Sequence, residues 1–191
     1  EKKYAKFADL PQPKIVSVET DMALYPLERR YVMTNTYVLE NKTQSAITEL
    51  LISTNRDVTY SQVEVSDARL VEHDETFYQY RFKLDTPLMP QQSTELSMTA
   101  SRTHNGYNGI VSDSFFTPDF VYFRDVRYGP MLGFNHHYQI QAAVLRQEYG
   151  LTPLPEPQTL EQQIDGRHGD FTADIDWAQI ETRVSTHIDH I

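Results

Sequence analysis

The chain has 191 residues, of which 39% are hydrophobic and 23% charged, and this composition is typical of one globular domain with a real core. Its formal net charge is −10, so it lacks the basic surface that nucleic-acid binding requires. It has no cysteine, which excludes disulfides, thiolate metal ligands and cysteine catalysis. No apolar run approaches the roughly 20 residues that cross a bilayer, and the opening residues do not resemble a signal peptide. We therefore expect any membrane segment or export signal to lie outside this chain.

The first hundred residues read as an arm followed by strands. Residues 1–14 are predicted to form a short N-terminal arm, closed by Pro11 and Pro13. From Ile15 the hydrophobic pattern has a period of two, which predicts a strand that buries one face. That face is expected to carry Val16, Val18, Met22 and Leu24. Further strands are predicted over residues 31–40, 47–54, 58–65, 68–71, 78–84 and 96–100.

The second half of the chain is less regular. A strand is predicted over residues 120–126 and a last strand over residues 177–186. The one principal helix is predicted near 137–149, with Gly150 as its C-terminal stop. Short strands joined by short turns are typical of a mainly β fold, either an antiparallel sandwich or saddle-like stacked sheets. We expect a single β domain over residues 15–191.

Several segments, taken in order, are similar to one protein family. Residues 10–15 (LPQPKI), 25–30 (YPLERR) and 39–43 (LENKT) resemble its first strands and turns. Residues 84–90 (LDTPLMP) resemble its L-x-P-L-x-P-G step, with Gln91 where glycine is usual. The later matches are residues 130–135 (PMLGFN), 146–151 (RQEYGL) and 180–186 (IETRVST). The set resembles the N-terminal β domain of gluzincin zinc metallopeptidases of the aminopeptidase N type, as found in the extracytoplasmic part of bacterial ABC-type permease/aminopeptidase fusions.

The resemblance implies a domain without its own catalytic site. The family's zinc motif is His-Glu-x-x-His with a later Glu, and this sequence contains no His-Glu pair. The family's Gly-x-Met-Glu-Asn segment is absent as well. The resemblance implies that both lie downstream, in a catalytic domain that holds the zinc. It further implies a periplasmic or cell-surface location, with the catalytic domain and membrane segments of the parent protein as partners. We therefore expect no cofactor and no enzymatic activity in this chain.

An aromatic stretch is the candidate interdomain or ligand surface. Its residues are Phe115, Phe116, Phe120, Tyr122, Phe123, Tyr128 and Phe134, to which we add Trp177 as a core or interdomain anchor. These aromatic residues either complete the core or form a face that the catalytic domain covers. An exposed face of this kind can drive self-association of the chain. The alternative function is a stand-alone β-sandwich module that recognises a peptide or a carbohydrate through its aromatic loops.

Possible metal ligands are few. The adjacent His136 and His137 would point about 100° apart on a helix, so surface or capping positions are favoured over ligation. His187 and His190 would face opposite sides of a strand. Loop carboxylates such as Asp174 can bind calcium, but the spacing does not match an EF-hand. The sequence therefore predicts no metal site.

Overall fold

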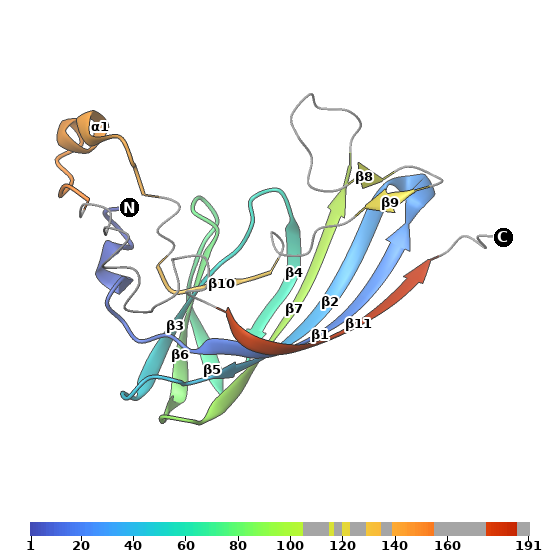
Figure 1. Ribbon diagram of the computed structural model, residues 1–191, viewed down its shortest axis with the longest axis horizontal. Helices are drawn as coiled ribbons and strands as arrows, with labels where there is room; N and C mark the ends of the chain where they lie inside the picture. The colour runs from blue at the N-terminus through green and yellow to red at the C-terminus, as the bar shows by residue number, and fades with distance from the viewer. Residues whose placement is uncertain (105–114, 117–119, 123–128, 135–138, 155–174, 187–191) are drawn as a thin grey trace, which may run out of the picture.

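The computed structural model describes residues 1–104, 115–116, 120–122, 129–134, 139–154 and 175–186. The strands of this part form two main sheets, which confirms the mainly β fold class (Figure 1). Sheet A has five strands, in the order β11 (Ile175–Thr186), β1 (Lys14–Tyr25), β2 (Arg30–Glu40), β7 (Ser93–Thr103) and β4 (Thr59–Val65). Sheet B has four, in the order β10 (Met131–Leu132), β3 (Ile47–Ser53), β6 (Gln79–Leu88) and β5 (Ala68–Asp74). A small ribbon pairs β8 (Phe115–Phe116) with β9 (Val121–Tyr122).

The main core lies between sheet B and one end of sheet A. Sheet A contributes alternate residues of β2, such as Tyr37 and Leu39, because successive side chains of a strand point to opposite faces. Sheet B contributes Leu50 and Ile52 from β3 and Phe82 from β6, each at most 3% exposed. The strand predicted over residues 31–40 is confirmed as β2, and its burial alternates along the strand.

Sheet A extends well beyond sheet B, as Figure 1 shows. Its far half carries a second apolar cluster around Tyr31 and Met33, both fully buried, with Met22 at 7% exposure. Val121 of the small ribbon packs against this cluster. The two sheets therefore overlap only in part, which gives a long curved sheet with a shorter sheet stacked on one end, as the saddle-like alternative anticipated.

The N-terminal arm covers the outer face of sheet B. It contains one turn of 3-10 helix, η1 (Ala5–Phe7), and Tyr4 and Phe7 are each 7% exposed. Both pack on Leu51, whose neighbours Leu50 and Ile52 face the main core. Because β3 is covered on both faces, it reads as a continuous apolar run instead of an alternating one.

A bulge at the start of β1 corrects the predicted buried face. The pairing of β1 with β2 shifts between Ile15 and Ser17, so Val16 is the extra residue. The extra residue shifts the alternation of side chains by one position. As a result Ile15, at 3% exposure, points to the same side as Val18, and both contact the same core cluster. Strict alternation placed Val16 on that face, and this was wrong because alternation cannot anticipate an inserted residue.

The predicted helix is found at its place but is shorter than predicted. Helix α1 spans Ala143–Glu148, and residues 139–142 are not helical, while 137–138 lie outside the described residues. Its only buried side chain is Arg146, whereas Val144 is 77% exposed. Without an apolar face to bury, tertiary packing adds little to helix length. The predicted stop is confirmed, since Gly150 has φ +61°.

Several strand ends also differ from prediction, and β7 extends three residues beyond the predicted 96–100 at both ends. β5 continues to Asp74, and the turn follows over residues 75–78. Tyr78 lies in that turn with φ +54°, so β6 begins at Gln79 and runs on to Leu88. Of the strand predicted over 120–126, β9 is the described part, and 123–126 lie outside the described residues.

Candidate functional site

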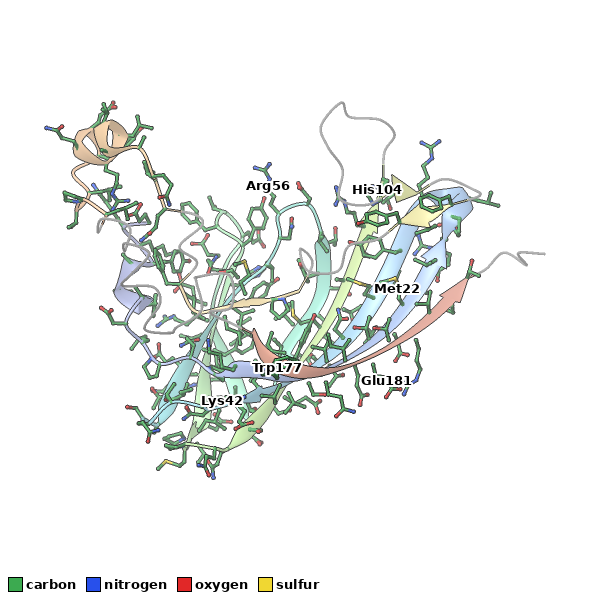
Figure 2. The ribbon with its side chains drawn as sticks, viewed as in Figure 1. Met22, Lys42, Arg56, His104, Trp177 and Glu181 are labelled. Carbon is green, nitrogen blue, oxygen red and sulfur yellow. The ribbon has the colours of Figure 1, made fainter. Side chains whose placement is uncertain are left out.

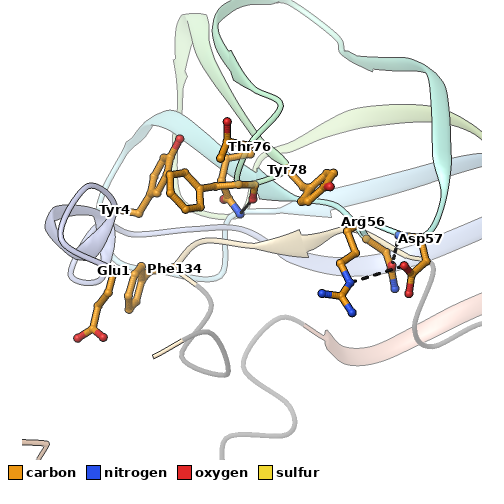
Figure 3. A pocket seen from close by; sticks show the side chains of 10 residues that line it. Glu1, Tyr4, Arg56, Asp57, Thr76, Tyr78 and Phe134 are labelled. Atoms are coloured by element: carbon orange, nitrogen blue, oxygen red, sulfur yellow. Dashed lines mark hydrogen bonds and ion pairs between the residues drawn. The ribbon is translucent and has the colours of Figure 1, made fainter. Parts of the chain in front are cut away.

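A pocket lies where the N-terminal arm meets the loops at one end of sheet B (Figure 3). It has a volume of about 420 Å³. The arm, the loop between β3 and β4, the turn between β5 and β6, and the residues after β10 all contribute to it. Its lining residues are Glu1, Tyr4, Asn55, Arg56, Asp57, Thr76, Phe77, Tyr78, Gln79 and Phe134.

The apolar wall of the pocket is aromatic. Tyr4 and Phe77 meet edge to face with 6.2 Å between their ring centroids, a favourable geometry for aromatic pairs. Phe77 and Tyr78 remain 54% and 40% exposed, so their rings are accessible to a ligand. Phe134 packs against the cluster of Tyr4, Phe7 and Leu51. This wall can accept an aromatic or aliphatic group.

Hydrogen bonds hold the β5–β6 turn in place beside the arm. The Asp74 carboxylate accepts hydrogen bonds from the backbone N–H groups of Thr76 and Phe77, at 3.0 and 3.1 Å. It also accepts one from the Tyr4 hydroxyl, at 2.7 Å, and pairs with Lys3. The Lys3 ammonium, and then the Tyr4 hydroxyl, lower the pKa of Asp74 to about 2. Burial raises the pKa of Tyr4, and its bond to the Asp74 carboxylate adds to this. The turn and the arm are therefore joined by charge-assisted contacts.

The charged residues of the pocket do not form a catalytic set. The Arg56 side chain is 76% exposed and its Nε lies 3.6 Å from Oδ1 of Asp57. The Glu1 carboxylate is bound to the guanidinium of Arg146, with 2.8 Å between Oε1 and Nη2. Among the lining residues, the Tyr4 hydroxyl donates to the Asp74 carboxylate, which is also bound to Lys3. An aromatic wall with a few polar groups is typical of a binding pocket.

A second candidate surface is the open end of sheet A at β11. In the parallel pairing of β1 with β11, Ile180 lies opposite Val18 and Val184 lies opposite Met22. Opposite residues of paired strands point to the same face, so Ile180 and Val184 continue the core-facing side of the sheet. Yet they are 68% and 60% exposed, whereas Met22 is only 7% exposed. We call Ile180 and Val184, with the strand that carries them, the open face.

The aromatic residues predicted from the sequence are distributed over three places. Phe120 and Tyr122, at 60% and 45% exposure, lie on and beside β9 over the far half of sheet A. Phe134 lies in the pocket, and Trp177, at 95% exposure, lies on β11 (Figure 2). The backbones of Phe115 and Phe116 pair with β9, but their side chains lie outside the described part, as do Phe123 and Tyr128 entirely.

Sequence reasoning missed most of the pocket. Tyr4, Arg56 and Phe77 come from three distant segments, and no motif links them. The signal for the open face was present, because Ile180 and Val184 are the apolar residues in the part of β11 from Gln179 to Thr186, where the other residues are polar. Such a pattern reports an apolar face but not whether another element covers it.

The structure adds little on metals or membranes. His136, His137, His187 and His190 all lie outside the described residues, as does Asp174. Within the described ranges no group of three potential ligands is arranged to hold a metal ion. No helix in that same part is long and apolar enough to cross a membrane.

Comparison with known proteins gives a partial likeness to solved structures. No family model matches the chain, and no curated protein matches it. Among solved structures, the M1 zinc metallopeptidase from Deinococcus radiodurans matches at a TM-score of 0.39 and 12% sequence identity, over 51% of this chain and 21% of that chain. A mutant of that enzyme with bound Tyr-Ser-Ala substrate matches at a TM-score of 0.38 and 13% identity, over 51% of this chain and 22% of the other. The match therefore spans about a fifth of the enzyme, and at this level it assigns neither family nor activity.

Proposed function

We propose that this chain is the noncatalytic N-terminal β domain of an aminopeptidase N-like zinc metallopeptidase, within the extracytoplasmic part of a transporter-associated membrane protein. It braces a catalytic domain and helps to shape the entrance for the substrate. The ordered sequence resemblance supports this proposal, as does the arrangement of a long curved sheet with a shorter sheet stacked on one end. In the parent protein the zinc activates water for attack on a peptide carbonyl, and no step of that reaction is assigned to residues of this chain.

The observation that carries the proposal is the open face. Ile180 and Val184 extend the core-facing side of sheet A, yet they are 68% and 60% exposed. An apolar strip that continues from a buried core into solvent is what a domain presents when a second domain completes it. Covering an isoleucine and a valine contributes about 1.5–3 kcal/mol for each side chain.

The proposal can be tested with the separated catalytic domain of the parent protein. Binding of that domain to this chain is measured by calorimetry, for the wild type and for Ile180→Asp with Val184→Asp. Removing both apolar contacts is expected to weaken binding at least tenfold. Gln179→Asp with Ser185→Asp is the matched control, because it places the same two charges one residue away on the other face of β11, and it should change binding less than threefold. Equal binding by all variants, or no zinc in the parent, would contradict the proposal.

The pocket supports a second candidate, a module that binds a peptide or a carbohydrate. Its aromatic wall, its volume of about 420 Å³ and the single cation of Arg56 at its rim are the observations in favour. Ligand-observed NMR with short peptides and oligosaccharides tests it. Phe77→Ser should abolish any specific signal, whereas the same change at the distant Phe120 should not.

A further inference from the structure

Strand β11 forms an unusually long edge of sheet A. It has 12 residues, and in the described part of the chain it pairs with β1 on one side and with no strand on the other (Figure 1). An edge strand presents a row of backbone N–H and C=O groups that can pair with another strand. Natural proteins usually protect such edges with proline, lysine or a bulge, and β11 contains neither proline nor lysine.

The opposite edge of sheet A, strand β4, is less able than β11 to pair with another strand. β4 has only 7 residues, and its pairing with β7 is interrupted by a bulge between Tyr60 and Gln62. In sheet B, the edge strand β10 has 2 residues and β5 carries a bulge between Leu70 and Glu72. The pairing of β11 with β1 also shifts register, between Ile175 and Gln179, but it is continuous from Gln179 to Thr186. Among the described edge strands, this part of β11 is the longest uninterrupted stretch on which a sheet can be extended.

The sequence of β11 is complementary to itself in one antiparallel register. When two copies pair around a two-fold axis at Thr182, Glu181 lies opposite Arg183 of the second copy, and Arg183 lies opposite Glu181. The same register sets Ile180 opposite Val184, in both directions. Opposite charges and apolar pairs directly across from each other stabilise antiparallel strands. All four side chains are more than half exposed, so they are accessible to a second copy.

Neighbouring registers are unfavourable for the same residues. An axis at Glu181 sets two carboxylates opposite each other, and an axis at Arg183 does the same with two guanidinium groups. An axis between Glu181 and Thr182 is not possible in a regular strand pair, because it would set Ile180 opposite Arg183, whose side chain points to the other face of the sheet. The net charge of −10 on each chain opposes non-specific contact, so any attraction has to come from local pairs of this kind.

We propose that two copies of this chain join through β11 as an antiparallel, two-fold symmetric strand pair centred on Thr182. The two five-stranded sheets then form one continuous sheet across both copies. Within each copy, Arg183 is 3.6 Å from Asp21 of β1 and 2.5 Å from Glu181, so its charge already has partners in its own chain, and the Glu181 of the second copy adds one on the outer side of β11. Figure 2 shows Glu181 along the outer strand of the sheet. The proposal concerns the edge of β11 and does not rest on the function proposed above.

Charge reversal on the 191-residue chain tests both the partner and the register. Sedimentation equilibrium over a range of concentrations gives the dimer dissociation constant. Glu181→Arg alone and Arg183→Glu alone each create like-charge pairs and should weaken the dimer at least tenfold. The chain with both changes restores opposite pairs and should return to within threefold of wild type. An equimolar mixture of the two single variants should form a heterodimer for the same reason.

The matched control is Glu19→Arg, because Glu19 lies beside Glu181 in the β1–β11 pairing but not at the edge. It changes the net charge by the same amount and should leave the dimer unchanged. Thr182→Cys provides a second measurement, since the chain has no other cysteine and a residue on the two-fold axis faces itself. Mild oxidation should cross-link this variant, and Glu19→Cys should stay uncross-linked. A chain that stays monomeric, or a dimer that ignores single charge reversals or is not restored by the double change, would overturn the proposal.

Discussion

Asn41 is the buried polar residue whose replacement should be most informative about the fold. It is fully buried just after β2 and uses its whole side-chain amide. Nδ2 donates to the carbonyl oxygens of Ser45 and Leu88, at 2.8 and 2.7 Å. Oδ1 accepts from the backbone N–H and the hydroxyl of Thr43, at 2.9 and 2.7 Å. The amide therefore joins the β2–β3 turn to the end of β6.

Asn41→Asp keeps the shape of the side chain but removes both donors. The carbonyl groups of Ser45 and Leu88 lose their partners, and an unsatisfied buried acceptor costs about 1–3 kcal/mol. The expected loss in the free energy of unfolding at pH 7 is therefore about 2–6 kcal/mol. The assay is urea unfolding followed by circular dichroism. Trp177 is 95% exposed and would report poorly on the core.

The sign of the pH dependence separates this mechanism from a packing effect. Burial and the two facing carbonyl oxygens disfavour the ionised carboxyl at position 41, so its pKa in the folded state is raised above the unfolded value. The folded variant then binds its proton more tightly than the unfolded chain. Its loss in the free energy of unfolding relative to wild type should therefore be smallest below the unfolded pKa of about 3.9 and should grow as the pH rises. Gln147→Glu on the exposed side of α1 adds the same charge and should cost little. A loss below about 1 kcal/mol at pH 7, or a deficit that grows on acidification, would refute the reasoning.

Three further predictions concern the arm, a turn and zinc. Lys3 and Tyr4 lower the pKa of Asp74 in the folded state to about 2, so the wild type loses stability as the pH falls from about 3.9 to 2. Asp74→Asn should remove this pH-dependent part of the stability. Unfolding curves at pH 5 and pH 2.5 measure it, and equal acid sensitivity of both proteins would count against the prediction. Gly133→Ala should destabilise the chain by about 1–3 kcal/mol, since Gly133 has φ +79° and a Cβ there would lie 3.0 Å from Cγ of Gln12; a thermal melt within error of wild type would contradict this. Purified chain should hold no stoichiometric zinc and hydrolyse no aminoacyl substrate, as the missing His-Glu pair implies; elemental analysis and a chromogenic assay decide it.

The side-chain amide of Gln12 makes the hydrogen bonds to the backbone of β3 that a neighbouring strand would otherwise make. Its Nε2 donates to the carbonyl oxygen of Glu49, and its Oε1 accepts from the N–H of Leu51, both at 3.1 Å. Gly133 then donates its N–H to the carbonyl oxygen of Leu51 at 2.7 Å. The arm and β10 therefore satisfy the outer edge of β3 together. The sequence placed Gln12 between two prolines but gave no sign of this role.

The sequence was most informative where burial follows local periodicity. In β2, the residues Tyr31, Met33, Tyr37 and Leu39 alternate with exposed positions, so one face of the strand could be identified from hydrophobicity alone. Helix α1 was located from its glycine stop, but its length could not be predicted. The pattern that suggested a longer helix included Val144, which is 77% exposed and so adds no buried contact that would lengthen the helix.

The sequence by itself determined most of the longer strands, where most turns lie, and that the chain is acidic and has no cysteine. Only the tertiary structure decided that β11 returns to lie parallel to β1, that a bulge brings Ile15 into the core, and that Tyr4, Arg56 and Phe77 surround one pocket. The reason is physical. A repeat of two residues fixes which side of a strand is apolar, but it does not say which distant segment covers that side, and for Ile180 and Val184 no described segment does.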